Sequence, residues 1–141
     1  MAKYKNKFFD KIKYKSSASE NVVFGMNDDH RMKTWKEEQK KWGGWDERVG
    51  WCLNNFMIEQ IYTWLCIYYK NASKWIDLTF YKFDINGEKL TQGECIQRAI
   101  NDMGYYLLNL DSFDNEVNKK MSERIQEAFK ILGVILPALW W

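Results

Sequence analysis

The chain has 141 residues, a formal net charge of +2 and a charged fraction of 28%. This length fits one domain and buries enough surface for a core without metal or disulfide support. The small net charge argues against binding nucleic acid with the whole surface and leaves only a local patch for that purpose. The aromatic content is high, with eight each of Trp, Tyr and Phe. Because such residues fill cores and interfaces, we expect a heavily packed core, a partner surface, or both.

Residues 1–20 are predicted to be a basic arm, separate from a single helical domain over residues 21–141. Lysines interleaved with Tyr4 and Phe8 supply both phosphate contacts and stacking, so the arm is a candidate contact for nucleic acid or an acidic partner. A solvated tail is the alternative. The arm has no apolar secretory segment, so we expect a cytoplasmic protein. Its candidate binding lysines are Lys3, Lys5, Lys7, Lys11, Lys13 and Lys15.

Residues 28–42 are predicted to form a helix. Acidic residues stand at its start and lysines at its end, as the helix dipole prefers, and Gly43 with Gly44 ends it. One face is apolar apart from Gln39 and consists of Met32, Trp35, Gln39 and Trp42.

Residues 46–70 are predicted to be the central helix of the fold. Apolar residues surround most of it, and only Asn55, Glu59 and Thr63 trace a polar line, which is typical of a buried helix. Several polar side chains interrupt its most apolar stretch, so a buried helix is favoured over a membrane span.

The hydrophobic period changes after residue 73. Ile76, Leu78 and Phe80 alternate as in a strand, and Asn86-Gly87 favours a type I′ turn. We therefore predict a small β-hairpin near residues 80–90.

Two further helices are predicted near the end of the chain. Thr91 and Glu94 form a capping box, so a helix begins at about residue 92. Asp111 and Ser112 are predicted to cap the next helix, which Gly133 and Pro137 end. The apolar stripes are Ile96, Ile100, Met103, Leu107 and Leu110 in the first helix, and Val117, Met121, Ile125, Ala128 and Leu132 in the second.

Few residues favour catalysis. His30 is the single histidine and lies in a polar run, where a surface position at a helix start is expected. The cysteines Cys52, Cys66 and Cys95 are widely spaced and are interpreted as reduced core thiols. The carboxylates Asp77, Asp84, Glu88 and Glu94 match no metal-binding or acid–base motif. We therefore expect no enzyme, cofactor or metal.

The tryptophans divide into two groups. Trp35, Trp51, Trp64 and Trp75 lie on apolar faces and are interpreted as core residues. Trp42 and Trp45 flank the glycine pair and Trp140 and Trp141 end the sequence, so these four are the candidate binding residues if they are exposed. For the terminal pair, closure of the core is weighed slightly above exposure.

Three segments together resemble small uncharacterised proteins of tailed bacteriophages. They are GWDERVGW (44–51), KFDINGEKLTQGE (82–94) and ILGVILPALWW (131–141), so the resemblance covers residues 44–141. It implies a phage origin, with the host cytoplasm or a virion as the setting, and assigns no residue a role.

We thus predict a mainly α, single-domain helical bundle around the 46–70 helix, with the small hairpin. The predicted function is non-enzymatic binding of a host macromolecule by a phage-encoded protein, as an inhibitor of a defence or housekeeping complex. A protein partner, of the host or the phage, is expected, and no membrane. The alternatives are a virion or assembly component and a nucleic-acid or nucleotide binder that uses the arm and exposed aromatics. The sequence does not fix the oligomeric state.

Overall fold

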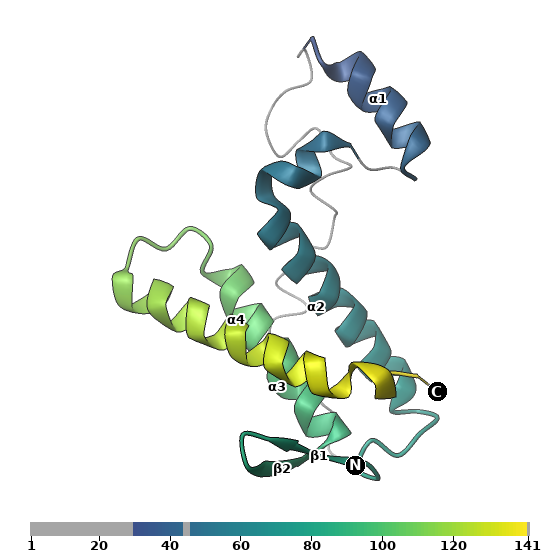
Figure 1. The fold of residues 1–141 in the computed structure, drawn as a ribbon, viewed down its shortest axis with the longest axis vertical. Coiled ribbons are helices and arrows are strands. Elements are labelled where there is room, and N and C mark those ends of the chain that lie inside the picture. The colour runs from purple at the N-terminus through teal and green to yellow at the C-terminus, as the bar shows by residue number, and fades with distance from the viewer. Residues whose placement is uncertain (1–29, 44–45, 141) are drawn as a thin grey trace. The chain divides into compact units, whose positions relative to one another are not determined.

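A computed structural model describes residues 30–43 and 46–140, without the side chains of Val49, Trp51 and Cys52. The predicted basic arm and its boundary at residue 20 lie outside these residues. The fold is mainly helical with one small antiparallel hairpin, as predicted (Figure 1). The described residues fall into two compact units, residues 30–60 and residues 61–140, and the boundary lies within helix α2.

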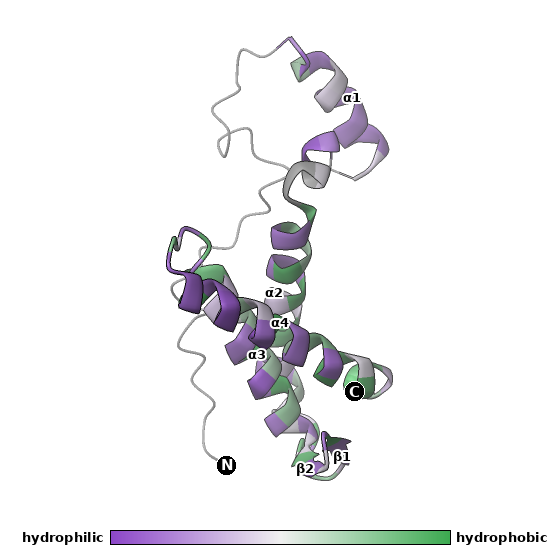
Figure 2. Ribbon diagram, turned by 60° about the vertical axis from the view of Figure 1, so that its left-hand side comes forward, coloured by the Kyte–Doolittle hydropathy of each residue, from purple (hydrophilic) through white to green (hydrophobic). Residues whose placement is uncertain are grey.

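The unit of residues 30–60 begins with α1 (Met32–Lys41), which is shorter than the predicted helix over 28–42. Gly43 has a positive φ of 66°, which a glycine adopts without a steric penalty, and the helix ends before it as predicted. Figure 2 shows that α1 is mostly hydrophilic. Trp35 is its buried residue, whereas Trp42 is 48% exposed.

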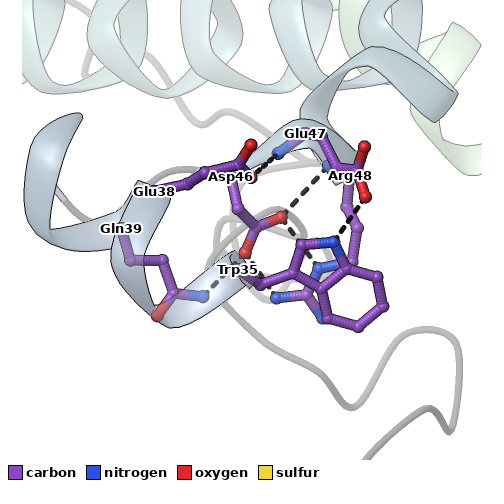
Figure 3. Close-up of polar contacts among 6 residues, drawn as sticks. All are labelled: Trp35, Glu38, Gln39, Asp46, Glu47 and Arg48. Carbon is purple, nitrogen blue, oxygen red and sulfur yellow. Dashed lines mark hydrogen bonds and ion pairs between the residues drawn. The ribbon is translucent and has the colours of Figure 1, made fainter. Parts of the chain in front are cut away.

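A polar cluster surrounds Trp35, and we call it the Trp35 cluster (Figure 3). It joins α1 to the 3-10 helix η2 (Glu47–Cys52). The Trp35 indole Nε1 donates to Glu47 Oε1 at 2.7 Å, and Gln39 Nε2 donates to Asp46 Oδ2 at 2.7 Å. Glu38 accepts from the backbone N–H of Glu47 at 3.0 Å.

A buried ion pair lies at the centre of the cluster. The Arg48 guanidinium donates to Asp46 Oδ1 at 2.8 Å and Oδ2 at 2.6 Å, and both side chains are inaccessible to solvent. The guanidinium also lies over the Trp35 ring, 4.3 Å from its centroid. Burial alone would raise the pKa of Asp46, but the hydrogen bonds from Arg48 and Gln39 outweigh it and lower the pKa below the ordinary value of 3.8.

The predicted helix 46–70 is α2 (Leu53–Ala72), preceded by η2. The expectation of burial nearly all round is wrong. Tyr62 and Leu65 are buried, but Trp64 is 63% exposed, and Leu53, Met57 and Ile67 are also exposed. The polar line is not fully solvent-facing either, since Thr63 is buried. Composition alone indicated burial, but packed neighbours cover only part of the helix surface, and the apolar residues elsewhere remain in water.

The unit of residues 61–140 contains the predicted hairpin, β1 (Lys82–Ile85) and β2 (Glu88–Thr91). The strands pair antiparallel with Phe83 opposite Leu90. Asn86 and Gly87 have φ of 55° and 83°, as the predicted type I′ turn requires.

Helices α3 (Gln92–Leu108) and α4 (Asn115–Ile135) pack against each other. The capping box of Thr91 and Glu94 is confirmed. The cap of α4 is Asp114, not Asp111 or Ser112, because its carboxylate accepts from the amides of Glu116 and Val117. The helix also continues through Gly133 and is followed by η3 (Leu136–Ala138), which contains Pro137. Buried residues of the predicted stripes are Ile96, Ile100, Met103, Met121, Ala128 and Leu132. The prediction is wrong for Leu110, which lies beyond the end of α3 and is exposed.

Cys66 and Cys95 are free and buried, as predicted for core thiols. Among the described residues, no helix is both long and apolar enough to cross a bilayer.

The buried ion pair yields a prediction about local stability. Replacing Arg48→Met leaves the Asp46 carboxylate buried without its charged partner, which costs about 3–5 kcal/mol. Amide hydrogen exchange should therefore show easier opening of α1. The matched control is Arg98→Met, which removes the solvent-exposed pair with Glu88 and should cost under about 1 kcal/mol. Equal effects of the two variants would contradict this ranking.

The lowered pKa of Asp46 yields a pH dependence. Because the folded pKa lies below 3.8, the ionised carboxylate stabilises this unit above that pH, and the contribution is lost as the pH falls towards the folded pKa. Hydrogen exchange of the α1 amides between pH 5 and pH 2 should accelerate, beyond the intrinsic trend, in the native protein but not in Asp46→Asn. Asp111→Asn, a change in an exposed loop, should keep the native pH profile.

Candidate interaction surface

The loop of residues 73–81 joins α2 to β1 and is folded on its own hydrogen bonds. Asp77 Oδ1 accepts from the backbone N–H of Thr79 at 2.9 Å and from its hydroxyl at 2.6 Å. The amides of Trp75 and Ile76 both donate to the carbonyl of Ala72 at 2.9 Å. This Asx-type turn fixes the loop without strand pairing.

The same loop is attached to the start of α3. The backbone N–H of Gln92 donates to the carbonyl of Tyr81 at 3.0 Å, and that of Gly93 donates to the carbonyl of Leu78 at 2.9 Å. Leu78 is buried, while the aromatic side chains remain outside. The predicted strand alternation of Ile76, Leu78 and Phe80 is therefore wrong. These residues belong to a loop in which Leu78 is buried between the exposed residues Asp77 and Thr79.

The C-terminal segment, residues 136–140, is held by side chains from α2 and α3. Gln92, whose side chain is buried, donates from Nε2 to the carbonyl of Ala138 at 2.9 Å. Tyr68 donates its hydroxyl to the carbonyl of Trp140 at 3.0 Å. Burial raises the pKa of Tyr68, and the hydrogen bond from Gln92 offsets this only in part, so the phenol keeps the proton that it donates.

The loop of residues 73–81 and the C-terminal segment supply most of the lining of a groove of about 500 Å³, which we call the aromatic groove. Figure 2 shows that the end of α4, which contributes Val134 to the lining, is hydrophobic. The groove is lined mainly by apolar side chains, with Asp77 as its single charged residue. The lining residues are Ile76, Asp77, Phe80, Tyr81, Phe83, Gln92, Val134, Pro137, Ala138 and Trp140.

Large aromatic side chains at the groove remain in solvent although their backbone is fixed. Phe80 is 74% exposed, Tyr81 57% and Trp140 70%, and Trp75, which belongs to the same loop as Phe80, is 75% exposed. The rings of Phe80 and Tyr81 meet edge to face with centroids 5.0 Å apart. Clustered exposed aromatics with fixed backbones are typical of binding surfaces, since little conformational entropy is lost on contact.

Of the four candidate tryptophans, Trp140 lies at the groove. The C-terminal segment is hydrogen-bonded to the rest of its unit, yet the indole is exposed, so closure of the core is wrong for this side chain. Trp42 is exposed in the unit of residues 30–60, where Lys41 Nζ lies 5.8 Å from its ring centroid. Trp45, Trp141 and all six candidate lysines lie outside the described residues.

The predicted core tryptophans divide in the structure. Trp35 is buried, as predicted, whereas Trp64 and Trp75 are largely exposed, so the core interpretation is wrong for these two. The sequence interpretation also missed Phe80 and Tyr81. Asp77 followed by Thr79 signals an Asx-type turn, and that signal could have placed the two aromatics in an exposed loop.

The candidate catalytic residues have separate structural roles. Asp84 accepts from the backbone N–H of Gly87 at 2.8 Å, Glu88 pairs with Arg98, and Glu94 completes the capping box. His30 is exposed just before α1. Within residues 30–43 and 46–140, no group of His, Cys, Asp or Glu side chains is arranged to hold a metal ion.

Comparison of the chain with protein-family models, curated proteins and solved structures gave no match.

The position of Trp140 should depend on Gln92. Replacing Gln92→Leu removes the donor to the Ala138 carbonyl, at a cost of about 1 kcal/mol, and should accelerate hydrogen exchange of the Leu139 and Trp140 amides. The control is Gln97→Leu on the same helix, which removes a 2.7 Å hydrogen bond to Tyr69. It should leave both amides unchanged. Faster exchange in both variants would mean that general loosening, not the Gln92 contact, holds the segment.

Proposed function

We propose that this is a non-enzymatic interaction protein whose aromatic groove takes an apolar segment of a partner protein. The observation that carries the proposal is the gathering of Phe80, Tyr81 and Trp140 around one apolar depression while each remains more than half exposed. Trp and Tyr are the residue types that carry most binding energy at protein interfaces. A backbone fixed by hydrogen bonds lowers the entropic cost of using them.

The chemistry of the lining supports binding more than catalysis. Its ionisable side chains are Asp77 and Tyr81, and Asp77 already holds the loop through Thr79. No nucleophile and base lie together among these residues. Apolar surface with one charge suits recognition of a peptide segment, in which an apolar side chain fills the depression and a polar group sets the register.

The resemblance to tailed-bacteriophage proteins makes a host protein the first partner to test, and inhibition of a host complex would follow from occupying its binding segment. Nucleic acid is a weaker candidate for this groove, because the one charge in its lining is negative and would repel phosphate.

Selection from a random peptide library tests the proposal. The wild-type protein should enrich peptides with large apolar residues, and the double variant Phe80→Ser, Trp140→Ala should bind them at least about thirtyfold more weakly. Because both side chains are exposed, these changes should leave the fold intact. Circular dichroism checks that point.

The matched control is Phe113→Ser. Phe113 is 99% exposed in the loop between α3 and α4, which adjoins the other end of α4 (Figure 1), and it does not line the groove. This variant should bind the selected peptides as the wild type does. The proposal fails if the groove variant selects the same peptides as the wild type. It also fails if only single-stranded oligonucleotides bind in a groove-dependent way.

A further inference from the structure

The carboxylate of Asp77 is used on one oxygen only. Oδ1 accepts two hydrogen bonds, from the backbone and the hydroxyl of Thr79, and a carboxylate oxygen offers two lone-pair sites. Oδ2 has no hydrogen bond or ion pair with any described residue. Asp77, which lines the groove, therefore carries a negative charge and one oxygen that has no donor among the described residues.

An apolar occupant alone would leave that charge uncompensated. Covering a carboxylate with apolar atoms removes its water, and this costs free energy unless a donor or cation replaces the water. Phe80, Tyr81 and Trp140 line the same groove, and aromatic rings attract cations to their faces. The carboxylate and the rings thus favour the same kind of group.

The open oxygen also distinguishes between cations. An arginine fork is best satisfied by two carboxylate oxygens, whereas a lysine ammonium is a compact charge that needs one. Because Thr79 occupies Oδ1, Asp77 offers a single-oxygen contact.

We propose that the partner segment carries a lysine, whose ammonium binds Oδ2 of Asp77 and lies among the aromatic rings while neighbouring apolar residues fill the groove. This inference rests on the proposed function and specifies the chemistry of the partner.

The variant Asp77→Asn tests the inference without dismantling the loop. The Asn side-chain oxygen can accept the same bonds from Thr79, since Asn forms the same turn, but the negative charge is lost. Peptides selected by the full-length wild-type protein should contain lysine at a fixed position among apolar residues. Peptides selected by Asp77→Asn should keep the apolar residues and lose the lysine.

Affinities then measure the contact directly. Replacing the lysine of a selected peptide by norleucine should weaken binding to the wild type about tenfold and leave binding to Asp77→Asn unchanged. Replacement by arginine should recover only part of the affinity. The norleucine change keeps the length and apolar stem of the side chain, so it isolates the ammonium.

The two proposals fail in different ways. If groove-dependent peptides are selected but carry no lysine, or if norleucine weakens binding equally in wild type and Asp77→Asn, the lysine inference is overturned while the interaction function stands. If no peptide distinguishes the wild type from the Phe80→Ser, Trp140→Ala variant, both are overturned.

Discussion

The aromatic groove depends on one buried amide side chain, that of Gln92 at the first turn of α3. The backbone N–H of Gln92 donates to the carbonyl of Tyr81. The Gln92 side chain donates to the carbonyl of Ala138 and, at 3.3 Å, to the hydroxyl of Tyr68. A buried amide that lost these partners would carry a desolvation cost, so the contacts are maintained together. The loop of residues 73–81, the C-terminal segment and α2 are thereby fixed around one point, and the exposed rings are fixed with them.

The distribution of apolar side chains explains why such a surface remains open. The core of the unit of residues 61–140 is closed by aliphatic residues of α3 and α4 together with Tyr62 and Leu65 of α2. The bulky rings of Trp64, Trp75 and Phe80 lie outside this core and are 63%, 75% and 74% exposed. An apolar side chain that finds no place in the core stays at the surface.

The sequence predicted several parts of the fold that depend on neighbouring residues. The capping box, the Asn86-Gly87 turn and most of the stripes of α3 and α4 involve residues a few positions apart, and these were found. It did not predict which side of α2 faces the core, because that depends on distant residues that cover the helix. The alternation of Ile76, Leu78 and Phe80 was misleading for a different reason. The local hydrogen bonds of Asp77 and Thr79 determine that segment, and hydrophobic period does not report them.

The candidate site was predicted in part. Trp140 was named as a candidate from the sequence, although closure of the core was favoured slightly for the terminal pair, and its side chain is exposed. The groove itself joins that residue to a loop more than fifty positions earlier in the sequence, and no local pattern encodes such a meeting. The role of Gln92 in forming the groove was equally hidden, because in the sequence Gln92 only stands between the two capping-box residues Thr91 and Glu94.

The hydrogen bond between Gln92 and the Ala138 carbonyl has a consequence for the protein during its synthesis. The loop and the hairpin emerge from the ribosome well before residues 134–140, so one wall of the groove is made long after the other. Until then Phe80 and Tyr81 line an incomplete surface, and the amide of Gln92 is satisfied only by water or Tyr68. The nascent chain thus acquires a complete binding surface only once α4 and the segment after it have been translated.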